Sequence, residues 1–578
     1  MKRASATQPT RPWHLLVLAW FVLAALFYVA YGISAILHHA PHALYADQWR
    51  QYVDYVSLPF PWNVFHPDNG HRLLLPNLIA WAELRWFDGN QWLQISCGIA
   101  SALIAACVAS LTCLRDDGVL VARRAAAMFL CFFAILWLGN ARTLFHSTEL
   151  LHTTLPMLCL MLALAACLAA TRAAPRLRPV ALALVLALAA SFSFGYGMAV
   201  FVGIFGALLA RKATLGQFAL WLGGLVATAA LYLLLPGTAG VTASMGFAPL
   251  QNLMAAARWL GAPFVTLFKY LWDPDASGLV PTQTLSHATH AIATTAAAHL
   301  PDLHTSVMPY ALFGALGMLA LAVASLRRLL ARERAGAIEA LGFGIAWFGL
   351  AAAGIVSLSR LAYFQQYPDQ IYADRYLPWP CLFWLGLALI ALGNSAASRV
   401  HGRNAIARGT FAFALLLPLL GWPLEYGGSI YAGLVRGQID NTAAGSLVGV
   451  IDRKQSQGET DSGEFERGYP VLRPQHIAQF ADAVAELIGK PQPTGSAVLP
   501  DATIETRRID ENLIGEPGTA VMLHLPASAS MPVRLLLVDA DNLVVGLVVR
   551  DARVQPPGYS GYARGVRAAT DLRAATLP

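Results

Sequence analysis

Long apolar runs separated by short polar segments make up most of the first 425 residues of the chain. The runs fall near residues 13–38, 92–114, 125–140, 151–171, 180–194, 197–210, 218–236, 307–326, 338–358, 377–393 and 409–425. About 20 apolar residues in helical form cross the core of a bilayer, where backbone polar groups must be bonded within their own segment. The pattern predicts a polytopic α-helical membrane protein with about eleven transmembrane helices. Between the fifth and sixth runs, Phe194-Gly195-Tyr196-Gly197 predicts a tight hairpin turn at the membrane surface.

Clusters of Lys and Arg between the runs predict the orientation. Cytoplasmic loops are the ones enriched in basic residues. The predicted cytoplasmic clusters are Lys2, Arg3 and Arg11; Arg115, Arg123 and Arg124; Arg172, Arg176 and Arg178; Arg211 and Lys212; Arg327, Arg328, Arg332 and Arg334; and Arg399, Arg403 and Arg408. The N-terminus is then cytoplasmic and the C-terminal region periplasmic, in a bacterial inner (plasma) membrane.

Two long segments, 39–91 and 237–306, fall on the predicted periplasmic side. Loops of this length are usually functional or disordered, and their many aromatic residues favour ordered, functional loops. Residues 251–272 are apolar enough to form a membrane helix, but a crossing there would move the Arg327–Arg334 cluster to the periplasm. We therefore expect a re-entrant segment or one that lies on the outer membrane surface.

The chain turns polar after the last apolar run. We expect residues 1–435 to form the transmembrane region, 436–474 a linker and 475–578 a small periplasmic domain. Apolar spacing predicts a helix over Gln475–Ile488. The runs Val533–Val538 and Leu543–Val549 predict a hairpin, and a further strand through 558–562 would complete a small β-sandwich.

Composition narrows the function classes. Charged residues make up 13% of the chain, about half the usual share, so most of its surface suits lipid better than water. The net charge of +7 comes from the topology clusters, and we predict no nucleic-acid partner. The seven cysteines fall in or beside apolar runs without metal-ligand spacing, so no cofactor or metal is indicated.

The segment after the first apolar run offers a candidate general base. Asp47 lies at the expected membrane surface, where partial desolvation raises a carboxylate pKa toward the range useful for a base. The alternative is structural, with Asp47 as a helix N-cap or an ion-pair partner of Arg50. Further on, His66, His71 and Arg72 surround a turn. The guanidinium of Arg72 is suited to bind phosphate. The structural alternative, an ordinary turn before a helix, is equally favoured.

Two further periplasmic segments carry candidate pocket residues. His146, Glu149 and His152 share a broad helix face. They could bind a metal ion or line a polar pocket, or they could be ordinary polar residues where a helix begins at the membrane surface. Arg375 is expected at the outer mouth of the tenth apolar run, where arginine is costly unless it is paired or bound to an anion, and Arg360 falls in the same loop. Asp374 would be the structural partner of Arg375, and a lipid phosphate the functional one.

With these residues in view, the chain resembles the C-type superfamily of integral-membrane glycosyltransferases. The likeness covers the architecture of residues 13–425 and the short motifs Asp47-Gln48-Trp49, Asn69-Gly70-His71-Arg72 and Asp374-Arg375-Tyr376. It implies transfer of a sugar, with inversion, from a polyprenyl-phosphate donor to a glycan, lipid or protein acceptor.

The resemblance also implies roles for residues. Asp47 would be the catalytic base, and Arg375, Arg72 and Arg360 would hold the donor phosphate. The remaining substrate pocket would comprise Tyr45, Trp49, His66, His71, His146, Glu149 and Tyr376. Many members carry two adjacent acidic residues in the first loop, whereas Gln48 follows Asp47 here, which makes a metal-dependent variant less favoured.

Three other functions fit the same topology. An O-antigen polymerase or ligase also places arginine and histidine in periplasmic loops. A lipid-glycan transporter or flippase would place ionisable groups at mid-membrane depth, where the apolar runs have almost none. A non-catalytic envelope protein that binds a partner through its periplasmic domain is the third alternative.

Overall fold

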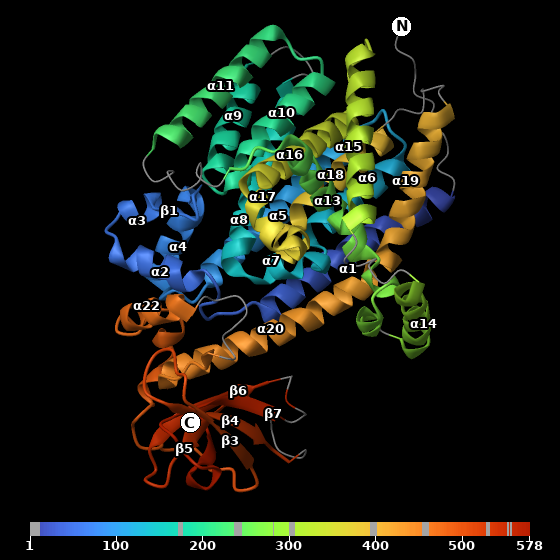
Figure 1. Ribbon diagram of the computed structural model, residues 1–578. Coiled ribbons are helices and arrows are strands. Elements are labelled where there is room, and N and C mark those ends of the chain that lie inside the picture. Colours follow the sequence, from blue (N-terminus) through green and yellow to red (C-terminus); the bar gives the residue numbers. More distant parts are fainter. Residues whose placement is uncertain are drawn as a thin grey trace.

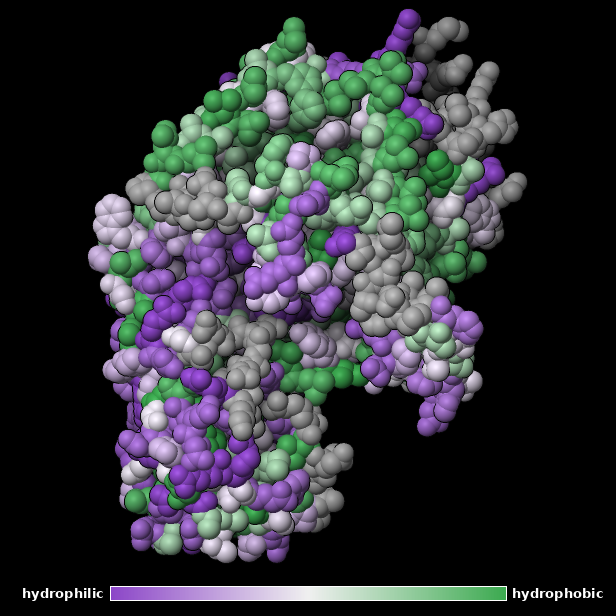
Figure 2. Space-filling model, in the orientation of Figure 1, coloured by the Kyte–Doolittle hydropathy of each residue, from purple (hydrophilic) through white to green (hydrophobic). Residues whose placement is uncertain are grey.

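The computed structural model describes residues 12–170, 177–235, 245–280, 282–299, 307–393, 401–453, 462–526, 532–551, 554 and 558–578. A helical bundle precedes residue 449, and a single β-sheet follows residue 502 (Figure 1). Hydrophobic surface covers the bundle around α9, α10, α11 and α15, whereas hydrophilic surface covers segment 39–91 and the C-terminal domain (Figure 2). This division is typical of a membrane region joined to a water-exposed domain.

Seven described helices are long and apolar enough to cross a membrane. They are α1 (Pro12–His39), α5 (Trp92–Leu114), α6 (Val121–Leu136, continued by α7, Ala141–Phe145), α8 (Ser147–Ala170), α11 (Leu215–Leu234), α15 (Val307–Leu330) and α16 (Ala337–Ser359). The pair α19 (His401–Leu420) and α20 (Trp422–Val448), bent by 41°, meets the same criteria when taken together, as a broken span or a re-entrant loop. Shorter apolar helices are α9 (Arg178–Ser191), α10 (Ala199–Ala210) and α18 (Pro378–Gly393). A multi-pass helical protein is thus confirmed, and eleven crossings remain a prediction.

The predicted cytoplasmic loops meet at one end of the bundle. Lys212 Nζ, in the α10–α11 turn, donates to the carbonyls of Arg328 and Leu329 at the end of α15, both at 2.9 Å. Asp116, between α5 and α6, accepts a 2.9 Å hydrogen bond from the Ile338 amide in the first turn of α16. The shared end agrees with the predicted grouping. Lys2, Arg3, Arg11, Arg172, Arg176 and Arg399 lie outside the described residues.

Both ends of helix α13 (Pro249–Leu267) lie near the carboxyl ends of other bundle helices. Just before α13, the Gly246 amide donates to the Leu358 carbonyl at the end of α16, at 2.9 Å. Just after it, the Tyr270 hydroxyl is 3.5 Å from the Leu420 carbonyl at the end of α19. Because α16 and α19 end away from the Asp116 contact, α13 begins and ends on one side, as a re-entrant or surface segment requires.

Segment 39–91 folds into short elements beside the bundle (Figure 1). They are α2 (Gln48–Ser57), α3 (Trp62–Phe65), the two-residue strands β1 (Pro67–Asp68) and β2 (His71–Arg72), and α4 (Leu74–Phe87). Segment 237–306 is described in part, as α13, the 3-10 turns η3 (Lys269–Leu271) and η4 (Pro274–Leu279), and α14 (Gln283–His299). Residues 237–244, 281 and 300–306 of this segment lie outside the described residues.

Much of the predicted linker, residues 436–474, is helical. Helix α20 continues to Val448, and α22 (Ser462–Leu472) follows. The prediction of a helix over Gln475–Ile488 was wrong, because this segment contains two 3-10 turns, η7 (Ala478–Ala481) and η8 (Ala483–Glu486). The backbone at Ala478 has φ +55°, and Asp482 is extended and caps Val484 with its side chain, so a continuous helix cannot form.

The C-terminal domain is one six-stranded antiparallel sheet in the order β3-β4-β7-β6-β5-β8. Its strands are β3 (Thr503–Ile509), β4 (Gly518–His524), β5 (Arg534–Val538), β6 (Val544–Arg550), β7 (Gly558–Arg564) and β8 (Arg573–Thr576). The predicted hairpin is confirmed by the β5–β6 pair, with Leu536 opposite Leu547. The predicted sandwich was wrong: the end of α20, through Leu447 and Val448, packs against apolar residues of the sheet where a second sheet would lie.

Candidate functional site

Three segments distant in sequence converge away from the Asp116 end of the bundle. The first runs from Tyr45 into α2, the second is the α7–α8 junction, and the third is 360–377, with α17 (Leu361–Gln366), η5 (Pro368–Tyr372) and η6 (Asp374–Tyr376). Gln48 joins the first two through 2.8 Å and 2.9 Å hydrogen bonds from its Nε2 to Ser147 and Thr148. Helix α7 packs against η6, which adds the third.

Asp47 occupies the N-cap position of α2, but its carboxylate makes no capping hydrogen bond. Ala46 before it has φ +50°, a left-handed conformation that costs an alanine energy and is frequent at functional sites. The Asp47 side chain is 54% exposed, and its nearest polar contacts are Arg50 Nη1 at 3.6 Å and Asn69 Nδ2 at 3.5 Å. The carboxylate is therefore held at the surface of the cluster and stays accessible.

Arg50 is shared among three carboxylates. It contacts Asp68 at 3.0 Å and Glu464 of α22 at 2.5 Å, both closer than Asp47. The predicted ion pair between Asp47 and Arg50 is thus present, and it is the longest of the three. Desolvation raises the pKa of Asp47, while the charge of Arg50 and, more weakly, those of Arg375 and Arg142 lower it. The net effect is upward, in the direction that suits a base.

Arg375 is a half-buried cation held by neutral groups. Its Nη2 donates to the Tyr363 hydroxyl at 3.2 Å and to Gln370 Oε1 at 3.1 Å, and its guanidinium lies 5.3 Å from the Tyr376 ring. Within the described part of the chain no carboxylate forms an ion pair with it, so the expected Asp374 partner is replaced by Tyr363 and Gln370. Its hydrogen-bond partners are neutral, while the charge of Glu149 acts on it from nearby, and a guanidinium held in this way is suited to bind an anion.

Arg142 and Glu149 form an ion pair within the cluster. Arg142 Nη2 is 3.1 Å from Glu149 Oε1, and its guanidinium lies 5.3 Å from the Tyr45 ring. His146 is buried against Tyr45, with ring centroids 5.2 Å apart, and its Nδ1 accepts from the Glu149 amide at 3.3 Å. Burial lowers the pKa of His146 well below its usual value, so the ring is neutral. The predicted pocket residues Tyr45, His146 and Glu149 are thus adjacent.

His71 joins the cluster through the predicted hairpin turn. Its ring packs on Phe194 at 4.7 Å, and a Cβ on Gly195 would lie 2.5 Å from His71 Nδ1. Phe194 also stacks on His152 at 5.1 Å. Burial, helped by the charge of Arg360, lowers the pKa of His71 to about 4. The sequence signal for this turn was its glycines, because a glycine allows a neighbouring group to approach the backbone closely.

Gln48 and the turn at Phe194 are site elements that the sequence reasoning did not assign. Gln48 is buried, and besides Ser147 and Thr148 it contacts Gln91 at 3.1 Å and accepts from the Tyr45 amide at 2.9 Å. It therefore fixes the start of α2 and supplies no charge. Among the described residues, no group of three His, Cys, Asp or Glu side chains is arranged to hold a metal ion.

Three predicted site residues lie elsewhere. Arg72 donates to the carbonyls of Tyr232 and Leu235 at the end of α11, where a cation caps the helix. Trp49 is 1% exposed in an apolar core, 5.0 Å from the Phe465 ring of α22. His66 lies 3.5 Å from the carboxylate of Asp54 in α2. The observed contacts of Arg72 and Trp49 are structural.

A scan against models of known protein families and a search of curated proteins both found no match.

Proposed function

We propose that this protein is a membrane glycosyltransferase that moves a hexosyl or pentosyl group from a polyprenyl-phosphate donor to a cell-envelope acceptor. One observation carries the proposal: the accessible Asp47 carboxylate, with a raised pKa, lies within electrostatic reach of the half-buried Arg375, whose side-chain hydrogen bonds go to neutral groups. A base close to an anion-binding cation suits transfer from an anionic leaving group to a hydroxyl.

The residues divide the chemistry between them. Asp47 accepts the proton of the acceptor hydroxyl as its oxygen forms a bond to the anomeric carbon of the sugar. The bond from that carbon to the phosphate oxygen breaks, and the polyprenyl phosphate leaves with the electron pair. Arg375 stabilises the negative charge on the departing phosphate. Attack opposite the leaving group inverts the anomeric carbon.

Other residues near the site support Asp47 and Arg375. Arg360, beside His71, is our candidate for a second phosphate contact, whereas Arg72 is excluded from this role because helix carbonyls already occupy its guanidinium. Arg142 adds positive charge near Asp47 and is itself paired with Glu149. His71 and His146 are neutral and contribute polar side chains without charge.

The proposed setting is the periplasmic face of a bacterial inner membrane. The positive-inside rule supports this, because the basic clusters of the α10–α11 and α15–α16 loops meet at the opposite end of the bundle from the site. Polyprenyl-linked sugars carry their phosphate at headgroup depth, which is the depth proposed for Arg375.

A glycan profile of envelope material tests the proposal. Cells would carry wild type, Asp47→Asn, Arg375→Ala or the control Arg467→Ala, an exposed arginine on α22. We expect one sugar to be missing from both site variants, with the protein still inserted in the membrane, and to be present in wild type and control. A complete glycan profile in Asp47→Asn would remove the catalytic role.

A further inference from the structure

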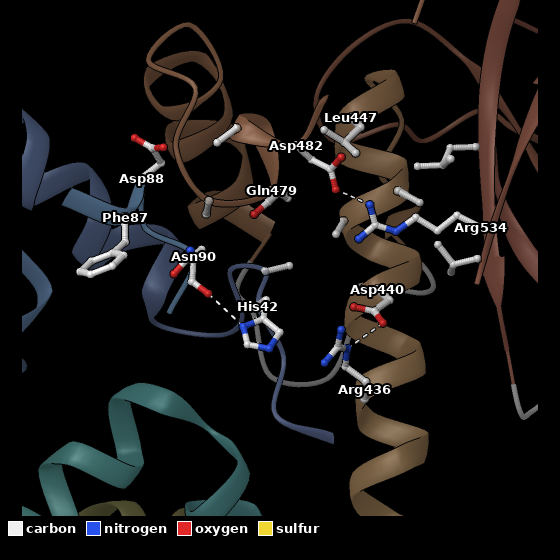
Figure 3. A pocket seen from close by; sticks show the side chains of 17 residues that line it. His42, Phe87, Asp88, Asn90, Arg436, Asp440, Leu447, Gln479, Asp482 and Arg534 are labelled. Carbon is white, nitrogen blue, oxygen red and sulfur yellow. Dashed lines mark hydrogen bonds and ion pairs between the residues drawn. The ribbon is translucent and has the colours of Figure 1, made fainter. Parts of the chain in front are cut away.

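A cavity of about 290 Å³ lies where segment 39–91, helix α20 and the C-terminal domain meet. Figure 3 shows Phe87, Asp88 and Asn90 on one side and Arg436, Asp440 and Arg534 on the other, with His42 and Gln479 between them. Gln479 ties the three parts together: its Oε1 accepts from the Leu44 amide at 3.2 Å, and its Nε2 donates to Ser446 of α20 at 3.3 Å. None of the proposed reaction residues lines this cavity.

The polar lining combines donors and acceptors with little net charge. Arg436 pairs with Asp440 at 2.7 Å, and Arg534 pairs with Asp482. Asp88 adds one carboxylate, so three carboxylates face two guanidiniums. Burial lowers the pKa of His42, so its ring is neutral at pH 7, and it is 3.0 Å from the Asn90 carbonyl. This lining repels phosphates and other anions, since both arginines are already neutralised.

Hydrogen-bonding capacity remains after the ion pairs form. In the described part of the chain, Arg436 donates from Nε to Asp440 and from Nη1 to the Ala40 carbonyl, which leaves Nη2. The same contacts use Asp440 Oδ2 and leave Oδ1. Fixed pairs of charged donors and acceptors can serve a hydroxyl group, which both donates and accepts.

Apolar surface completes the lining. Phe87 is 44% exposed beside the cavity, and Ala443, Leu447 and Val549 contribute aliphatic groups. A sugar ring has hydroxyls at its edge and C–H groups on its faces, so it needs this mixture of polar and apolar contacts. Ligand pockets usually measure about 300–1,000 Å³, so this one suits a small ligand on the order of one or two sugar rings.

We propose that this cavity is a binding site for a neutral glycan, separate from the reaction site at Asp47. Resting on the proposed function, this ligand is part of the acceptor: His42 of the cavity and Asp47 of the reaction site belong to the same short segment between α1 and α2. The C-terminal domain, which supplies Asp482 and Arg534, then helps to select the acceptor.

The test is a glycan array of neutral and anionic oligosaccharides, probed with the full-length protein in labelled nanodiscs. We expect neutral glycans to bind and anionic ones to bind more weakly. Phe87→Ala removes the aromatic contact and should weaken binding about tenfold. Ala443→Trp fills the cavity and should abolish binding. The matched control Trp86→Ala removes an exposed aromatic residue that does not line the cavity and should bind as wild type.

Asp47→Asn separates the two proposals, since it should lose sugar transfer and keep glycan binding. If transfer fails everywhere while neutral glycans bind through Phe87 and Ala443, only the proposed reaction is wrong. Absence of neutral binding, stronger binding of anionic glycans, or wild-type binding by Ala443→Trp would overturn the inference about the cavity.

Discussion

Asp47 and Arg50 lie one turn apart, yet Arg50 is committed mainly to other carboxylates. Its guanidinium is 3.6 Å from Asp47 but 3.0 Å from Asp68 and 2.5 Å from Glu464. Because Arg50 is shared, its charge only partly offsets the desolvation that raises the pKa of Asp47. A carboxylate with a full ion pair would be a weak base; this one keeps its basicity and its access to solvent.

The acid limb of the pH profile should depend on Arg375. A base works only when ionised, so activity falls as pH drops through the pKa of Asp47. Desolvation raises that pKa and Arg375 lowers it, so Arg375→Ala should raise it further and move the acid limb to higher pH. The measurement is kcat/KM against pH. Arg375→Lys keeps the charge and should move the limb less, and an unmoved limb in Arg375→Ala would contradict the electrostatic link.

Gly195→Ala should disturb the site through His71. The new Cβ would lie 2.5 Å from His71 Nδ1, so the ring or the turn must shift, at a cost of about 1–3 kcal/mol. Gly216→Ala in α11 is the control, because a Cβ there meets nothing within 4 Å. Thermal unfolding in detergent should show a lower melting temperature for Gly195→Ala and an unchanged one for Gly216→Ala. Equal melting temperatures for the two variants would show that the turn is not tightly packed on His71.

Gln48→Leu should weaken the attachment of α2 to α8. It leaves Ser147 and Thr148 without the Gln48 amide, and each buried polar group that loses its partner costs about 1–3 kcal/mol. We expect lower thermal stability and reduced transfer, since Asp47 is the preceding residue. Gln48→Glu keeps an acceptor for the Tyr45 amide but loses the donors, so it should not restore wild-type transfer. Full activity in Gln48→Leu would show that this anchor is dispensable.

Trp49→Ala should lower the stability of the protein. The buried Trp49 ring packs against Phe465 and Phe480, with ring centroids 5.0 Å and 6.2 Å away, and truncating such a side chain costs about 3–5 kcal/mol. Trp86→Ala, at an exposed position, should change stability little. Limited proteolysis near α22 would report the loosening. If Trp49→Ala is as stable as wild type but fails to transfer sugar, the original assignment of Trp49 to the substrate pocket is right.

The sequence predicted the elements whose pattern is local. Apolar runs predicted the bundle helices, two short apolar runs separated by a polar turn predicted the β5–β6 hairpin, and paired glycines predicted the turn at Gly195 and Gly197. Contacts between segments far apart in the chain could not be predicted from the sequence. The α22 core that buries Trp49 and the α11 carbonyls that bind Arg72 come from residues more than 150 positions away. The α20 residues that cover the sheet also come from a separate part of the chain, so one sheet was mistaken for a sandwich.

The most direct test of the account is single-turnover transfer of a labelled sugar from a purified polyprenyl-phosphate donor. The control Asp54→Asn changes a carboxylate on the same helix that pairs with His66. We predict that Asp47→Asn slows transfer about 10²–10⁴-fold, the usual contribution of a general base, while Asp54→Asn stays near the wild-type rate. Transfer at the wild-type rate by Asp47→Asn would contradict the central claim.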